Sequence, residues 1–205
     1  MFTGIVTAIG EITKANQRGD LRLTISAPLD PAKIDIGASI ACSGVCLTVV
    51  ERGGSAGDAW FSVDVSGETV SCTAPDMWDE GSKINIEPSL RLGDELGGHI
   101  VTGHVDAVGE VVSVEAEGDS TRILIRAPAS LAPYIAAKGS ITVQGVSLTV
   151  NSVADQSDGS CDFALNIIPH TAEVTTLGAL SRGDSANLEI DVLARYLKRM
   201  QALAG

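Results

Sequence analysis

The chain has 205 residues, a formal net charge of −12, 44% hydrophobic residues and 20% charged residues. This length accommodates one large domain or two small ones, and the composition is that of a folded chain rather than a disordered one. The negative charge, without a cluster of lysine and arginine, argues against nucleic acid or an anionic membrane as a partner. The sequence opens without a basic and then apolar leader and has no apolar run of about 18 residues, so we expect a cytoplasmic protein.

The strongest pattern in the chain is an internal duplication. Residues Thr3–Glu11 and Thr102–Glu110 are identical at six of nine positions, and later matches keep nearly the same offset. These later matches pair Gly44–Val49 with Gly145–Val150, and Gly81, Asn85 and Glu87 with Gly183, Asn187 and Glu189. We predict two copies of a unit of about 100 residues, joined at a glycine-rich turn near residues 97–99. The predicted domains are residues 1–97 and 98–191, followed by a helix over 192–205.

Short alternating segments predict that both copies are built from β-strands. Residues 21–25 and 61–65 alternate apolar and polar side chains, and residues 123–125 and 163–167 are their counterparts. Glycine, aspartate and serine interrupt these runs at short intervals, which is typical of a small barrel or sandwich. We favour barrels because closure leaves no exposed sheet edge. Short helices are expected at 131–138 and 175–180.

The C-terminal segment 193–203 predicts an amphipathic helix. Apolar side chains recur on one face with helical spacing, at Leu193, Tyr196, Leu197, Met200 and Leu203. Such a face packs either on the chain's own barrel or on a second subunit, and the sequence leaves both alternatives open.

The cysteines and histidines do not form a metal-binding pattern. Cys42, Cys46, Cys72 and Cys161 contain no CxxC pair, and His99, His104 and His170 have no zinc-like spacing to them. We therefore expect no metal, and we expect free thiols in a reducing compartment.

Several ordered motifs resemble the riboflavin synthase family along essentially the whole chain. They are the start Met1–Val6, the segment Gly44–Val49, the segment Gly97–Val105, the segment Gly145–Val150, and Asn187–Asp191. The resemblance implies an all-β fold of two similar six-stranded antiparallel Greek-key barrels followed by a C-terminal α-helix. It implies a homotrimer assembled through that helix, with possible association with lumazine synthase. Each barrel would bind one 6,7-dimethyl-8-ribityllumazine, without a cofactor.

The resemblance also implies where catalysis occurs. Two substrate molecules would meet between the N-terminal barrel of one subunit and the C-terminal barrel of a neighbour. The two copies differ at matched positions, with Phe2 against Val101, Ile5 against His104, Cys46 against Ser147, and Ser89 against Asp191. Two identical sites could not distinguish the donor molecule from the acceptor molecule. We therefore interpret these differences as the specialisation of one site for each role. The expected catalytic residues are Cys46, His104, Ser39, Thr149 and Asp191.

The expected substrate-binding residues follow the same motifs. They are Phe2, Gly4, Ile5, Val6, Cys46, Leu47, Thr48, Asp64, Val65, Ser66, Gly67, Glu68, Thr69, Gly103, His104, Val105, Lys138, Ser147, Leu148, Thr149, Ile168, Pro169, His170, Thr171, Ala172 and Glu173.

Each of these residues also has an ordinary structural interpretation. A free cysteine is usually a buried hydrophobe, the threonines suit a strand, Ser39 and Ser147 suit a turn, and Lys138 suits a solvated surface. His99 is interpreted as structural. The sequence departs from the family at Ser43 and Gln144, where Asn and Asp are frequent, and at His170, where Glu is frequent.

Three other functions compete with a synthase. A non-catalytic lumazine- or flavin-binding protein would tolerate the loss of one site, whereas both copies here keep their Thr and Gly motifs. A barrel domain of a flavin oxidoreductase would need a nucleotide-binding partner domain, and no GxGxxG motif followed by an acidic residue is present. A purely structural duplicated barrel would leave the paired polar motifs unexplained.

Overall fold

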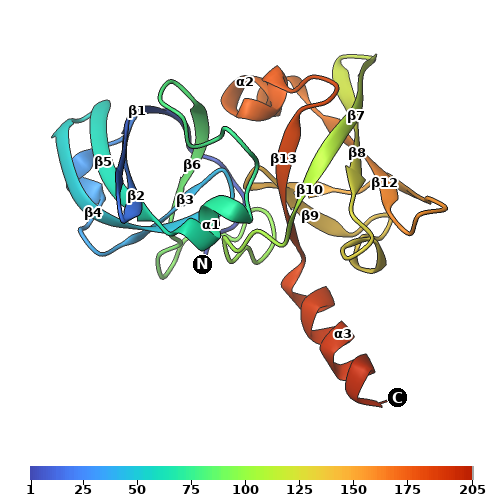
Figure 1. The fold of residues 1–205 in the computed structure, drawn as a ribbon. Helices are drawn as coiled ribbons and strands as arrows, with labels where there is room; N and C mark the ends of the chain where they lie inside the picture. Colours follow the sequence, from blue (N-terminus) through green and yellow to red (C-terminus); the bar gives the residue numbers. More distant parts are fainter. Residues whose placement is uncertain (205) are drawn as a thin grey trace.

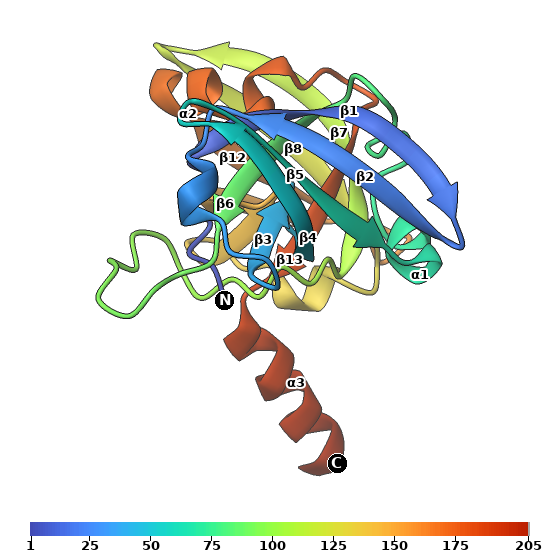
Figure 2. The same cartoon turned by 90° about the vertical axis from the view of Figure 1, so that its left-hand side faces the viewer.

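A computed structural model describes residues 1–204. Two β-barrels lie side by side, and a C-terminal helix projects away from them (Figures 1 and 2). Within the described residues, no helix is long and apolar enough to cross a membrane. The expected all-β fold of two duplicated barrels with a terminal helix is confirmed.

The first barrel is closed by six antiparallel strands. They are β1 (Ala8–Arg18), β2 (Asp20–Ala27), β3 (Ser39–Cys42), β4 (Val45–Ser55), β5 (Asp58–Val65) and β6 (Lys83–Pro88). The order around the barrel is β1-β2-β5-β4-β3-β6, and β6 pairs with β1 to close it. Strand β4 is long enough to pair with β3 through its first half and with β5 through its second half.

The second barrel repeats this order but divides the fourth strand in two. Its strands are β7 (Ala107–Glu117), β8 (Ser120–Ala127), β9 (Ser140–Val143), β10 (Val146–Thr149), β11 (Ser152–Asp155), β12 (Cys161–Ile167) and β13 (Ser185–Ile190). The sheet order β10-β9-β13-β7-β8-β12-β11 places the two pieces at opposite ends. Only residues 150 and 151 separate β10 from β11, and this break matches the bulge of β4 between Val49 and Glu51. The seven strands therefore occupy six barrel positions.

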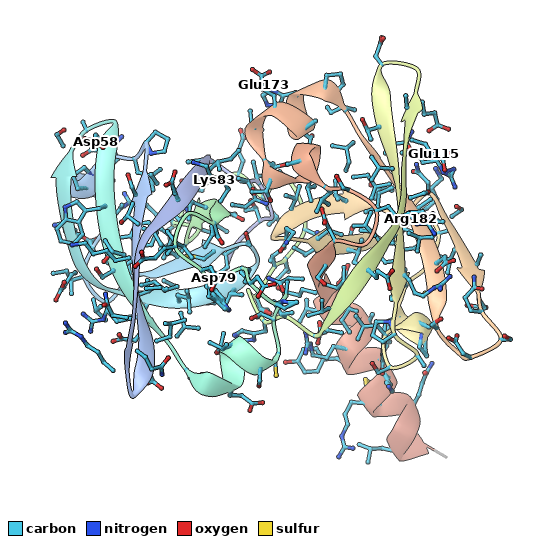
Figure 3. All side chains as sticks on the ribbon, turned by 45° about the horizontal axis from the view of Figure 1, so that its top comes forward. Asp58, Asp79, Lys83, Glu115, Glu173 and Arg182 are labelled. Carbon is cyan, nitrogen blue, oxygen red and sulfur yellow. The ribbon has the colours of Figure 1, made fainter. Side chains whose placement is uncertain are left out.

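Alternation along the strands fills both barrels with apolar side chains. Leu23, Ile25 and Phe61 are fully buried in the first barrel, and Ile125 and Phe163 hold the matching places in the second. The charged side chains labelled in Figure 3 lie around the outside of the two barrels. The period-two pattern of residues 21–25, 61–65, 123–125 and 163–167 thus predicted β-strands correctly.

Of the two expected short helices, the one at 175–180 is present and the one at 131–138 is shorter than expected. Residues 131–138 contain only the 3-10 helix η2 (Ala132–Tyr134), and Ile135 after it is extended, while Lys138 takes a positive φ of 66° that a helix does not allow. Residues 175–180 contain η3 (Thr176–Ala179), and η1 spans Pro31–Lys33. Two helices arise where only strand ends were expected, at α1 (Gly67–Ser71) and α2 (Pro169–Val174).

Two contacts connect the C-terminal helix α3 (Val192–Ala204) with the second barrel. Arg195 pairs with Asp106 at 2.8 Å, and the Lys198 ammonium lies 4.3 Å from the centre of the Tyr134 ring. The five side chains of its apolar face, Leu193, Tyr196, Leu197, Met200 and Leu203, are between 59% and 70% exposed. Most of this face is therefore left uncovered by the chain's own barrel.

The two barrels meet through their β3–β4 and β9–β10 turns. Ser43 and Gly44 both have positive φ, as do Gln144 and Gly145, which is the hairpin geometry that favours Asn, Asp and Gly. A Cβ built on Gly44 would lie 2.9 Å from the nitrogen of Gly145, so the two turns pack backbone against backbone.

Two matched asparagines fasten this contact. Asn85 donates to the Gln144 carbonyl at 2.8 Å and accepts from the N–H of Thr176. In the reciprocal arrangement, Asn187 donates to the Ser43 carbonyl at 2.9 Å and accepts from the N–H of Ala74. The duplication in sequence therefore appears as an approximate two-fold arrangement of contacts between the barrels.

Candidate active sites at the contact of the two barrels

Two short segments, which we call the arms, pass from one barrel to the other. The first arm is residues 2–6 and the second arm is residues 101–105. They cross at a bridge in which Phe2 and Val101 exchange backbone hydrogen bonds of 2.8 and 3.1 Å. Beyond the crossing, the Gly103 carbonyl accepts the N–H of Cys46 in the first barrel at 2.8 Å. The Gly4 carbonyl likewise accepts the N–H of Ser147 in the second barrel at 2.8 Å.

Glycine is required at the matched position of each arm. Gly4 and Gly103 have φ values of 76° and 77°, a region that glycine enters without steric cost. A Cβ on Gly4 would lie 2.5 Å from the Cβ of Ser147, and one on Gly103 would lie 2.7 Å from the Cβ of Cys46. Each arm therefore lies in direct contact with the other barrel.

A buried glutamate anchors each arm to its own barrel. Glu87 on β6 accepts the N–H and hydroxyl of Thr3 and the N–H of Gly4, at 2.7–3.0 Å. Glu189 on β13 accepts the N–H and hydroxyl of Thr102 and the N–H groups of Gly103 and His104, at 2.7–3.1 Å. Burial raises the pKa of Glu87 above 4.5, and the donors from Thr3 and Gly4 oppose that shift.

The first site combines the outer face of β3 and β4 with the second arm. Cys46 and Thr48 point away from the barrel core, because the alternate residues Val45, Leu47 and Val49 are buried in it. Ser39 lies opposite Thr48 in the β3–β4 ladder. The arm brings Val105 onto the core of the first barrel. The structure thus gathers predicted residues from both repeats at one place, with His104 exposed beside them.

The second site repeats this arrangement with different side chains. Ser147 and Thr149 take the places of Cys46 and Thr48, and Val6 of the first arm packs on the second barrel. Nδ1 of His99 lies 2.7 Å from the Ser147 hydroxyl, and its Nε2 lies 3.3 Å from the Thr142 hydroxyl. Burial lowers the pKa of His99 from 6.5, against the opposing effect of Asp191 and Glu189.

The chemistry of the two sites therefore differs. Around Cys46 the first site has the apolar cluster of Phe2, Ala41 and Val101. The matching part of the second site has hydrogen-bonding groups at Ser147, Thr142 and His99.

Both sites present backbone groups at an open strand edge. Val49 exchanges hydrogen bonds with Ala38 and Gly37 on the β3 side, and Cys46 donates on the opposite side to the second arm. Because adjacent residues of a strand direct their backbone groups to opposite sides, the N–H and C=O of Thr48 point away from β3. Strand β5 pairs with β4 only from Val49 onward. By the same alternation, Thr149 directs its backbone groups away from β9, next to the break after β10.

The remaining predicted residues fall into three groups. Ser66 caps helix α1 by accepting the N–H of Thr69. Ser66, Gly67 and Glu68 are exposed, as are Ile168, Pro169, His170 and Glu173 around α2, while Thr69, Thr171 and Ala172 are half-buried. Phe2 and Val65 are fully buried, and Leu47 and Leu148 pack in the barrel cores. Asp64 pairs with Arg22, which lowers the pKa of its carboxyl.

Two of the predicted residues show specific local geometry. Asp191 caps helix α3 by accepting the N–H of Leu193 at 2.9 Å. Lys138 is exposed and holds a positive φ of 66° where the first repeat has Gly37.

One cavity of the structure lies apart from most of the predicted residues. It measures about 640 Å³ and lies between the first barrel and the 88–97 linker. Ile5 is the predicted residue that lines it, together with Thr3. A smaller cavity of about 240 Å³ includes Ser39. The two sites are therefore identified from exposed strand edges and arms rather than from a deep pocket.

Sequence reasoning missed the residues that join the two barrels. The sequence interprets His99 as structural and uses Asn85 and Glu87 as evidence of duplication; Asn187 and Glu189 also belong to the Asn187–Asp191 motif. The usable signal was their alternation, because a strand that buries both an Asn and a Glu in each repeat must satisfy them with specific partners.

Comparison with known proteins places this arrangement in a family. A family model described as the lumazine binding domain matches twice, over residues 3–89 and 102–191. The chain is 48% identical over 204 residues to the riboflavin synthase of Brucella abortus (strain 2308), covering 98% of each chain. It is 45% identical over 207 residues to the riboflavin synthase of Mycobacterium bovis, covering 100% of each. Among solved structures, LumP complexed with riboflavin matches with a TM-score of 0.76 and 26% identity, over 93% of this chain and 99% of that one.

Proposed function

The chain belongs to the riboflavin synthase family, and we propose that it converts two molecules of 6,7-dimethyl-8-ribityllumazine into riboflavin and 5-amino-6-(D-ribitylamino)uracil. One substrate molecule gives up a four-carbon unit, namely two ring carbons with their methyl groups. The other molecule accepts this unit and becomes riboflavin. The enzyme is thus a transferase for the last step of riboflavin formation.

The observation that carries this proposal is the pair of matched but chemically different sites. A dismutation needs two places that bind the same molecule and treat it differently. The first site offers Cys46 and His104, and the second offers Ser147, Thr149 and His99. Holding two reactants in a fixed orientation can supply roughly 7–11 kcal/mol of the barrier in favourable cases.

The open strand edges suit the pyrimidine part of the substrate. A lumazine presents alternating N–H and C=O groups on that ring, which match the backbone groups of Thr48 in one site and Thr149 in the other. The hydroxyls of Ser39, Thr48, Ser147 and Thr149 lie on the strands that form these edges, as donors for the ring carbonyls and the ribityl chain. We add Lys138, whose N–H donates to the carbonyl of Val150, as a further donor to the substrate. These contacts fix the orientation of the ring.

The chemistry starts from the C7 methyl group of one bound lumazine. Its proton is acidic because the ring delocalises the carbanion, so the substrate is its own electron sink. We assign proton transfer and positioning to His104 and Cys46 in the first site and to Ser39, Thr149 and Asp191 around the reacting centre. No cofactor is included in this scheme.

Assembly forms part of the proposal. The exposed apolar face of α3 fits association of three copies through their helices, with the first barrel of one subunit facing the second barrel of a neighbour. We further propose domains at 1–97, 98–191 and 192–205, a cytoplasmic location, and association with lumazine synthase. Neither a nucleic acid nor a membrane partner is part of the proposal.

A second candidate function is ligand binding without turnover. It is favoured by the fold shared with LumP, whose solved structure contains riboflavin. The deciding experiment incubates the purified protein with 6,7-dimethyl-8-ribityllumazine alone and measures substrate and both products. Two lumazines consumed per riboflavin and per pyrimidine formed support the synthase, and tight binding without turnover supports the binding protein.

A further inference from the structure

Each arm is anchored in one barrel and completes the site of the other barrel; the inference drawn from this arrangement rests on the function proposed above. Each glutamate belongs to one barrel, while the arm that it anchors forms part of the other barrel's site. Glu189 on β13 of the second barrel holds Gly103 and His104, and Gly103 in turn accepts the N–H of Cys46 in the first site. Glu87 on β6 of the first barrel holds Gly4, which accepts the N–H of Ser147 in the second site.

The two carboxylates are placed to orient backbone rather than to touch substrate. Glu87 is 6% exposed and Glu189 is 2% exposed. Glu189 accepts four donors from three consecutive residues of the second arm, with two on each oxygen. An amide could not replace it, because its NH₂ group would face N–H groups that need an acceptor. A carboxylate is the side chain that satisfies such a set of converging donors.

We propose that Glu87 and Glu189 are reciprocal positioning residues, each fixing from one barrel the arm that completes the site of the other barrel. Glu189 sets the position of His104 relative to Cys46 and Thr48. Glu87 sets the position of Ile5 and Val6 relative to Ser147 and Thr149. The dependence of the two sites is therefore crossed. Substitution of the anchoring glutamate in one barrel is expected to impair binding in the site of the other barrel.

The test measures each site separately in the full-length chain, with riboflavin as the probe. In a Thr149→Pro background, which removes the ring-binding backbone N–H at the open edge of the second site, riboflavin reports on the first site, and in a Thr48→Pro background it reports on the second. Glu189→Gln should weaken riboflavin binding about tenfold in the Thr149→Pro background and less than about twofold in the Thr48→Pro background. Glu87→Gln should give the reverse pattern. Glu80→Gln, which alters an exposed glutamate that accepts the N–H of Ala15, is the matched control.

This crossed pattern separates positioning from a merely structural role. A general loosening of the second barrel by Glu189→Gln would weaken that barrel's own site, next to Thr149, at least as strongly as the first. That result, or equal weakening of both sites, would overturn the proposal.

Amide hydrogen exchange gives a readout that needs neither ligand nor turnover. Glu189→Gln should speed exchange at the Cys46 N–H by about tenfold while leaving Ser147 unchanged, and Glu87→Gln should do the opposite. If either Gln variant fails to fold, Thr102→Val and Thr3→Val remove one hydroxyl donor from each anchor and should show the same crossed pattern at smaller size. Unchanged protection at both amides would refute the positioning role. A wild-type chain that makes no riboflavin would refute the proposed function and leave the exchange test intact.

Discussion

The backbone N–H of Cys46 in the first barrel donates to the carbonyl of Gly103 in the second repeat at 2.8 Å. The two residues are far apart in the sequence, yet the Cβ of Cys46 lies where a side chain on residue 103 would begin. This contact places a thiol from one repeat next to the arm that carries His104 from the other.

Substitution of Gly103 by alanine should damage both stability and the first site. The new Cβ would lie 2.7 Å from the Cβ of Cys46, at a φ of 77° that alanine disfavours. We expect a loss of about 2–4 kcal/mol in the free energy of unfolding, measured with urea, together with reduced turnover. Gly118→Ala is the control, because Gly118 also has a positive φ but has open space around it, so about 1 kcal/mol is expected. Equal losses in the two variants would show that the contact with Cys46 is unimportant.

The variants Cys46→Ser and His104→Gln should lower turnover more than lumazine binding. Both keep a polar group of similar size beside the open edge at Thr48, so the ring should still bind, while proton transfer and positioning are impaired. We expect turnover to fall by about 10²–10⁴-fold if either residue transfers a proton. Single-turnover rates and fluorescence titration separate the two effects. Wild-type turnover in both variants would remove these residues from the catalytic set.

Lowering the pH should destabilise the fold through His99. Because burial holds its pKa below 6.5, the unfolded chain binds a proton at a pH where the folded chain does not. The stabilisation is therefore present above about pH 6.5 and is lost as the pH falls toward the lower pKa of the folded state. Urea unfolding of the wild type between pH 7 and 5 should show this loss, and His99→Gln should reduce it. Identical slopes for the two proteins would contradict the prediction.

Replacement of Asn187 by alanine should loosen the contact between the barrels. The side chain is 1% exposed and satisfies both the Ala74 N–H and the Ser43 carbonyl. Its removal leaves two buried backbone groups without their partner, at a cost of about 1–3 kcal/mol for each group left unsatisfied. Asn166→Ala, at an exposed side-chain contact with Asn151, is a suitable control. Thermal unfolding that is unchanged by Asn187→Ala would show that water replaces these bonds at no cost.

The apolar face of α3 gives a prediction about assembly. Leu197→Gln should shift the chain toward monomers in sedimentation velocity, because it places a polar group in the proposed contact between subunits. Arg199→Gln changes an exposed side chain outside the apolar face of the same helix and should leave the assembly intact. A wild-type protein that sediments as a monomer would refute the proposed trimer.

The strands and the duplication were predictable because they depend on local, repeated signals. Alternation over 61–65 and 163–167 marks half-buried strands wherever they pack, and an offset that stays near 100 marks two copies of one unit. The break between β10 and β11 was not predictable, because it involves only two residues at a position where the first copy tolerates a bulge.

The origin of each site from both repeats also lay beyond local patterns. His104 and Cys46 belong to two separate motifs of the sequence, and only the crossing of the arms brings them together. The roles of Glu87 and Glu189 depend on backbone donors that lie 83–87 residues away in the sequence. Long-range polar partners of this kind cannot be inferred from a period of two, because the same period buries apolar side chains equally well.

The linker between β6 and β7 makes the association of the two barrels, and hence the crossing of the arms, an intramolecular event. Two separate barrels would have to find each other by diffusion before exchanging arms, and that encounter would weaken on dilution. Covalent connection turns the encounter into an intramolecular closure with an effective concentration of the order of millimolar for a short flexible connection. The exchange at Phe2 and Val101 is therefore expected to persist at any protein concentration, so that each arm stays on the opposite barrel even where dilution separates the subunits.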